Sequence, residues 1–144
     1  MSATPLLAHT LAITFTVFGT PRPQGSMRAL WKPGMKYPAV TSDNPRLKPW
    51  RQQIAGVALA LNIAPFGDYV PLEITMNFYF TKPKSAKKRR GMTVKPDGDK
   101  LLRAVFDSLK GVLFHDDAQV VEFHARKHYG GPERVTVEIR EAIV

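Results

Sequence analysis

The sequence predicts a single-domain α+β protein with a mixed β-sheet and two helices packed on it. Its 144 residues suffice for one hydrophobic core, whereas two domains would each be marginal, so we expect one domain over residues 1–144. Two patterns predict the fold class: apolar and polar residues alternate in some segments, and apolar residues recur at spacings of three and four in others. Their order is β, weak hairpin, α, β, α, β, β, which is typical of helices layered on a sheet.

The first part of the chain predicts a strand, a hairpin and a helix. The strand ends at the glycines and prolines of residues 19–25, and its apolar positions are Leu11, Ile13, Phe15 and Val17. Residues 27–41 carry Pro-Gly between two short mixed runs, which indicates an irregular hairpin. Asn44 has the chemistry of an N-cap, with Pro45 at the first helical position, and the apolar spacing that follows predicts a helix to about Asn62.

The second part predicts three strands and one helix. Residues 72–80 alternate most regularly and predict a strand, and a helix is predicted over about 99–110, with Gly111 just beyond its C-terminus. Residues 119–128 and 134–140 read as two more strands, joined by the turn sequence YGGP. We expect these two strands to form an antiparallel pair.

The charge distribution favours a polyanionic partner. The formal net charge is +9, and residues 1–42 and 74–96 contain no Asp or Glu. Nucleic acid or an anionic membrane surface would fit this charge. A lone basic run such as KPKSAKKRR could also be a solvated loop or a nuclear localisation signal, but two long acid-free stretches favour nucleic acid. The candidate DNA-binding residues are Lys82, Lys84, Lys87, Lys88, Arg89, Arg90, Lys95 and Lys100.

Cysteine is absent, which excludes a disulfide framework and thiolate zinc sites and is compatible with a reducing cytoplasm. The N-terminal stretch lacks the basic start of a signal peptide, and no apolar run has the length of a membrane span. We therefore expect a soluble, cytoplasmic protein with no membrane partner.

The segment KPDGDKLLRAVFDSLKGVLFHDDAQVV holds five of the seven aspartates of this basic chain. On the predicted helix, apolar residues gather on one side, while Asp99, Arg103, Asp107 and Lys110 line the other. Asp107 is expected to pair with Arg103 or Lys110 on the surface. Asp97 and Asp99 precede the first full turn, where they could simply form a turn and an N-cap.

A second interpretation is that these aspartates bind a metal. Two carboxylates about 4 Å apart cost on the order of 4 kcal/mol at an effective dielectric of 20, while a helix terminus returns only about 0.3 to 1 kcal/mol. If Asp116 and Asp117 approach Asp97 and Asp99, the cluster needs protons, protein cations or a divalent metal, and hard oxygen ligands suit Mg²⁺ or Mn²⁺. We expect that approach because the helix returns to a strand beside the one that precedes it.

The motifs PDGDKLLRAVFDSL and GVLFHDDAQVV resemble the RusA family of Holliday junction resolvases, which are small phage and prophage endodeoxyribonucleases. The resemblance covers about residues 93–129. It implies that Asp97, Asp99 and Asp117 bind the metal and that Arg103 stands where the family has its catalytic lysine. Lys100 occupies a position where the family commonly has asparagine. Asp116 is a candidate further ligand or a residue that supports one.

The resemblance implies a Mg²⁺-dependent endodeoxyribonuclease, with Mn²⁺ as the other candidate ion, that resolves four-way DNA junctions in recombination and repair. It also implies a homodimer in a bacterial or phage-infected cell. The alternatives are a non-catalytic basic DNA- or RNA-binding module and a related metal nuclease that cuts other branched DNA. Trp31 and Tyr37 lie among basic residues of the predicted hairpin, where core packing is the expected role and base stacking the alternative.

Overall fold

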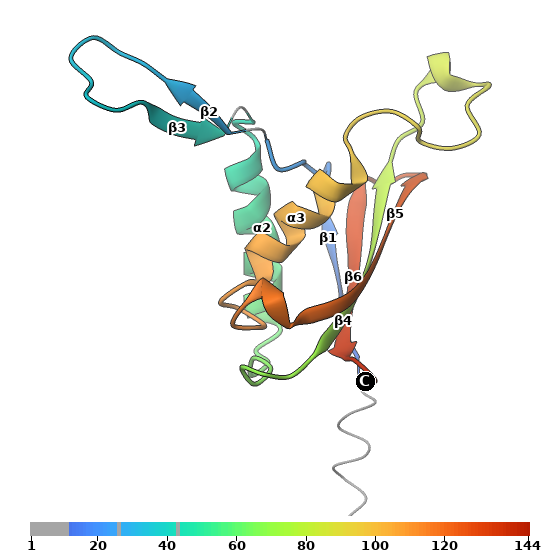
Figure 1. Cartoon of the computed structure of the whole chain (residues 1–144). Coiled ribbons are helices and arrows are strands. Elements are labelled where there is room, and N and C mark those ends of the chain that lie inside the picture. Colours follow the sequence, from blue (N-terminus) through green and yellow to red (C-terminus); the bar gives the residue numbers. More distant parts are fainter. Residues whose placement is uncertain (1–11, 26, 43) are drawn as a thin grey trace, which may run out of the picture.

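Four strands form the main sheet, and two helices cover one of its faces (Figure 1). The computed structural model describes residues 12–25, 27–42 and 44–144. Along the sheet the order is β1 (Ile13–Phe18), β6 (Arg134–Glu141), β4 (Leu72–Phe80) and β5 (Val120–Tyr129). The helices are α2 (Leu47–Ala60) and α3 (Gly98–Leu109), with short 3₁₀ turns η1 (Lys84–Ala86) and η2 (Asp117–Gln119). This arrangement confirms the predicted α+β class.

The core lies between the sheet and the helices. Every second residue of β4 is buried, as the alternation predicts; these residues are Leu72, Ile74, Met76, Phe78 and Phe80. The helices pack apolar faces on this layer, with Trp50 and Ile54 from α2 and Leu101, Val105 and Leu109 from α3 buried. The polar side of α3 faces outward, as expected from its period.

The predicted pairing of the last two strands is wrong. β5 runs parallel to β4, whereas β6 runs antiparallel to β4 on its other side and also pairs with β1. The helical crossover through α3 places β5 beside β4, because a connection of this kind joins parallel neighbours. The turn after β5 then passes the end of β4, where Gly130 N donates a hydrogen bond to Phe80 O (2.8 Å).

Two predicted element boundaries change. Arg46 occupies the N-cap position of α2, and the helix ends at Ala60. Asn44 instead accepts a hydrogen bond from Arg46 N (3.1 Å) in the turn that precedes the helix. The first strand begins at Ile13, and Leu11 lies outside the described residues.

A hairpin and the basic loop project from the end of the molecule where α3 begins (Figure 1). The hairpin, β2 (Met27–Leu30) and β3 (Ala39–Ser42), is a separate antiparallel pair, as predicted. Trp31 and Tyr37 are 65% and 72% exposed, so the expected core packing of these aromatics is wrong. Within the described ranges, no helix has both the length and the apolar character to cross a membrane.

Candidate functional site

The carboxylates at the start of α3 are not used to cap the helix. Asp97 occupies the N-cap position with an extended backbone (φ −72°, ψ 141°), but its side chain accepts no capping hydrogen bond. Asp99 lies exposed in the first turn. Among the described residues, neither carboxylate has a hydrogen bond or an ion pair. The capping interpretation of the PDGD motif therefore fails at Asp97, and both carboxylates are available for a ligand.

Asp116 has the structural role that Asp97 lacks. Its Oδ1 accepts a hydrogen bond from Ala118 N (3.1 Å) at the start of η2. This backbone hydrogen bond is the main cause that lowers the pKa of Asp116. Asp116 is therefore a capping residue that holds the segment carrying Asp117.

Gln119 fixes the same segment through its side-chain amide, a role that was not predicted from the sequence. Its Oε1 accepts hydrogen bonds from His115 N (2.9 Å) and Asp116 N (3.1 Å). Its Nε2 donates to Gly67 O (2.7 Å) and Val70 O (3.2 Å), and the side chain is buried. The signal was present, because an Asp followed three residues later by Gln is the spacing of a capping box.

The carboxylate of Asp117 is only partly compensated by its surroundings. Its Oδ1 is buried and has no hydrogen-bond partner. Burial raises the pKa of Asp117, and the neighbouring carboxylate of Asp107 raises it further, while Lys110 and Arg103 oppose the shift. Asp107 was expected to pair with Arg103 or Lys110 on the surface, and its effect on Asp117 was not foreseen.

The structure groups Asp117 with the C-terminal half of α3, away from Asp97 and Asp99. In the described part of the chain, no three His, Cys, Asp or Glu side chains lie close enough to hold one metal ion. β5 lies beside β4, as expected. α3, however, runs from the end of β4 back to the start of β5. A helix of 12 residues spans about 18 Å, so its first turn and the segment after it lie at different ends. The three-aspartate metal site remains a prediction.

The donor chemistry still fits a hard divalent cation. All candidate ligands are carboxylates, and an orphaned, buried carboxylate oxygen such as Asp117 Oδ1 is stabilised by a cation. Mg²⁺ commonly binds through one or two carboxylates and completes its shell with water and substrate phosphates. The residues therefore suit an open site of this kind better than a closed cage of three aspartates.

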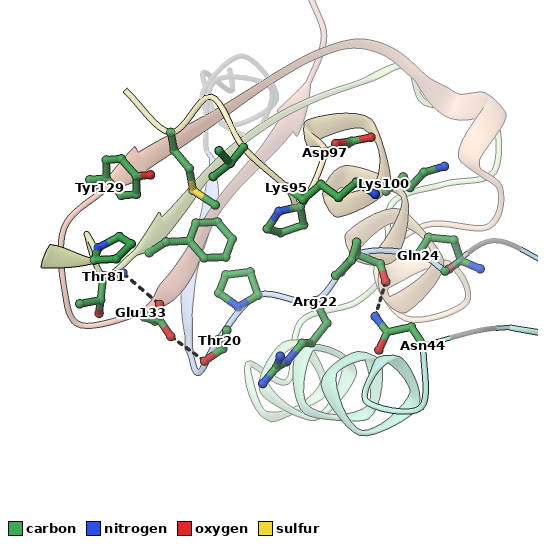
Figure 2. Close-up of a pocket in the computed structure, with 18 of the residues that line it drawn as sticks. Thr20, Arg22, Gln24, Asn44, Thr81, Lys95, Asp97, Lys100, Tyr129 and Glu133 are labelled. Atoms are coloured by element: carbon green, nitrogen blue, oxygen red, sulfur yellow. Dashed lines mark hydrogen bonds between the residues drawn. The ribbon is translucent and has the colours of Figure 1, made fainter. Parts of the chain in front are cut away.

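A cleft of about 660 Å³ adjoins Asp97. Figure 2 shows Asp97 and Tyr129 on opposite sides of it. Its cationic lining residues are Arg22, Arg89, Lys95 and Lys100. The other acid in the lining, Glu133, is engaged by Thr20 Oγ1 (2.6 Å) and Thr81 N (2.9 Å). Asp97 is thus a carboxylate without a partner at the edge of a cationic cleft.

The basic loop is anchored to the domain. Ala86 and Met92 are buried. Lys127 Nζ, from β5, donates to Val94 O (2.8 Å) and Pro96 O (3.0 Å) and so fixes the residues just before Asp97. The exposed candidate DNA-binding residues of the loop are Lys82, Lys84, Lys87, Lys88, Arg90 and Lys95. Their contact with DNA is untested and remains a prediction.

Arg89 and Lys100 are only partly exposed. Arg89 donates to the hydroxyl of Tyr129 (2.7 Å), and Lys100 lies in the first turn of α3, where it lines the cleft. Both cations therefore line the cleft beside Asp97, together with the more exposed Lys95.

Two comparisons relate this chain to known sequences. The chain is 33% identical to the uncharacterized protein YqaN of Bacillus subtilis (strain 168) over an alignment of 144 positions, which covers 90% of this chain and 96% of that protein. The sequence model of a family described as Endodeoxyribonuclease RusA matches residues 19–140, which include α3, the basic loop and the Asp116-Asp117 segment. Because this match spans most of the chain, the protein belongs to the RusA endodeoxyribonuclease family.

Proposed function

We propose that the protein is a metal-dependent endonuclease that resolves four-way DNA junctions in recombination and repair. Its family provides the class of reaction, hydrolysis of a DNA phosphodiester. The observation that carries the proposal is the pair of unpartnered carboxylates at the start of α3, beside a cationic cleft. Carboxylates left unpaired beside a cationic cleft suit a divalent cation that binds both the carboxylates and a DNA phosphate.

Asp97 and Asp99 would hold Mg²⁺ or Mn²⁺ in an open site at the start of α3, and Asp117 is the candidate metal ligand near the other end of the helix. Asp117 has the strongest support, because its buried Oδ1 has no partner. Asp97 and Asp99 are proposed on the resemblance and on their lack of partners. When bound, such an ion polarises the scissile phosphate and lowers the pKa of a bound water.

Arg103 would stabilise negative charge on the phosphate that is cut. It lies exposed one turn beyond Asp99 and within the electrostatic range of Asp117, so it lies between the two acidic groups. Its guanidinium can donate two parallel hydrogen bonds to a phosphate, which a lysine cannot. The basic loop would bind phosphates without reading sequence, so affinity should fall steeply with salt.

We also propose a cytoplasmic homodimer. A four-way junction has two strands to cut symmetrically, and a two-fold dimer presents two identical sites.

One assay tests the function. A synthetic four-way junction, a flap and a linear duplex of matched sequence are incubated with the protein in Mg²⁺, in Mn²⁺ and with chelator. We expect paired nicks in the junction that require metal and are lost in Asp97→Asn and Asp117→Asn, while junction binding persists. Cutting of the flap in preference to the junction would point to a nuclease for other branched DNA.

A non-catalytic DNA- or RNA-binding module is the second candidate. The observation that favours it is that no group of three potential metal ligands occurs among the described residues. It predicts binding that is indifferent to chelator and no cleavage of any of the three DNAs in any metal. Metal-dependent nicks that disappear in Asp97→Asn would exclude it.

A further inference from the structure

The β2–β3 hairpin projects beside the candidate active site, and its base is fixed there. Gln24 N, just before the hairpin, donates to Lys100 O (2.9 Å) in the first turn of α3. Asn44 Nδ2, just after it, donates to Pro23 O (2.9 Å), which ties the two legs together (Figure 2). The hairpin therefore extends from a base that is bonded to the residue following Asp99.

The far end of this hairpin presents aromatic rings and cations to solvent. Trp31 is 65% exposed and Tyr37 is 72% exposed. Lys32 and Lys36 lie between them, and Lys36 Nζ lies 5.8 Å from the centroid of the Tyr37 ring. Residues 1–42 contain no acid, so nothing in this segment neutralises these cations. Exposed aromatics flanked by cations are the combination with which proteins bind unpaired nucleic-acid bases.

We propose that the hairpin tip stacks Trp31 and Tyr37 on bases exposed at a DNA branch point, and that this contact selects branched over linear DNA. The inference rests on the proposed function, because it assumes DNA at the adjacent site. Paired bases inside a duplex are stacked on each other and offer no free face, whereas bases at a branch can be unstacked. The basic loop offers only charge and would not distinguish the two.

The reach of the hairpin suits this role. The four residues of β2, Met27–Leu30, cover roughly 13 Å at about 3.3 Å per residue. This corresponds to about four base steps of DNA at ~3.4 Å each. A strand cut beside Asp97 can therefore run to a branch point that the hairpin tip contacts.

Tryptophan fluorescence tests the contact directly. The chain has two tryptophans, and Trp50 is only 4% exposed, so Trp31 reports the hairpin tip. The protein is titrated with the four-way junction and with the matched duplex in chelator, which prevents cleavage. We expect quenching of Trp31 by the junction and little quenching by the duplex. Equal quenching by both DNAs, or none by the junction, would overturn the proposal.

Affinity measurements in the same buffer complete the test. Loss of one stacked base weakens binding roughly tenfold, so Trp31→Ala should bind the junction about tenfold more weakly and the duplex almost unchanged. Trp31→Phe, which keeps an aromatic face, should retain most of the affinity. Tyr69→Ala is the matched control, because Tyr69 is an aromatic that is 97% exposed in another loop. Equal losses on both DNAs, or no loss on the junction, would contradict selection by stacking.

Two further outcomes separate this inference from others. If sedimentation shows that Trp31→Ala abolishes a dimer, the tip contacts a second copy of the chain, and the DNA contact is refuted. If the junction quenches Trp31 but no metal supports nicking, the hairpin inference stands while the nuclease proposal fails.

Discussion

The starts of α3 and η2 are alike in sequence and differ in what they do with their aspartates. Asp97 and Asp116 are both N-cap residues with extended backbones, at ψ 141° and ψ 142°. Asp116 accepts a hydrogen bond from Ala118 N and belongs to a capping box, whereas Asp97 accepts no capping bond. An aspartate at the N-cap position of a helix therefore does not by itself form a capping hydrogen bond.

The second aspartate of each pair differs as well. Asp99 is exposed, while Asp117 carries a buried oxygen without a partner. At η2 the hydrogen bond of Asp116 fixes the segment in which Asp117 Oδ1 is buried without a partner. The hydrogen bonds of Gln119 to this segment hold it further. An unsatisfied group held by satisfied neighbours is what a binding site requires.

The rate of junction cleavage should show the largest difference between variants of Asp97 and Asp116. We expect Asp97→Asn to lower the single-turnover rate of junction nicking by at least about a hundredfold, because it removes a charged metal ligand. Asp116→Asn should cut at nearly the normal rate, since an amide oxygen can accept the same hydrogen bond from Ala118 N. Equal losses in both variants would mean that Asp116 is also a ligand.

Gln119→Leu should cause the largest loss of stability. It removes the acceptor for two backbone N–H groups and the donor for two carbonyls, which costs about 2 to 4 kcal/mol. Urea unfolding measures this change. Gln52→Leu, at an exposed glutamine of α2, is the matched control and should stay within about 0.5 kcal/mol.

Removal of the two cap side chains should give unequal shifts in Tm. Asp116→Ala should lower Tm by about 2 to 4 °C, because it removes a working cap from a domain of this size. Asp97→Ala should leave Tm nearly unchanged, since its carboxylate caps nothing. An equal decrease in both variants would show that Asp97 caps α3 in solution.

The pH dependence of Tm should give the smallest difference. The folded state raises the pKa of Asp117 above its ordinary value of 3.8, so ionisation of this carboxyl destabilises the fold as pH rises through that value and beyond. Asp117→Asn should therefore melt at a higher temperature than the wild type at neutral pH, and this advantage should vanish at lower pH, where the carboxyl is protonated.

The stability contributed by Asp116 should depend on pH in the opposite direction to that of Asp117. Its pKa is lowered, so its carboxylate stabilises the fold above pH 3.8 and loses that effect as pH falls.

Mg²⁺ should raise the Tm of the wild type and not that of Asp117→Asn. A rise of the same size in both proteins would contradict a metal contact at Asp117.

Periodic patterns predicted the elements well where one face is buried. Each inward residue of β4 is buried, and the polar stripe of α3 faces solvent, because burial imposes periods of 2 and 3.6 on the sequence. The order of strands was not predictable in this way. β5 and β6 are adjacent in the chain but are separated by β4, and that choice depends on how the crossover helix packs on the whole sheet.

The sequence by itself determined the class of fold, the polarity of α3, the hairpin, and the motifs that place the chain in its family, because these depend on local periodicity and on residue types at fixed spacing. Only the tertiary structure decided that Asp116 is a cap and Asp97 is not, that Asp117 lies beside Asp107, and that Trp31 faces solvent. Each of these depends on which distant backbone or charge comes within a few ångströms, and one-dimensional spacing does not contain that information.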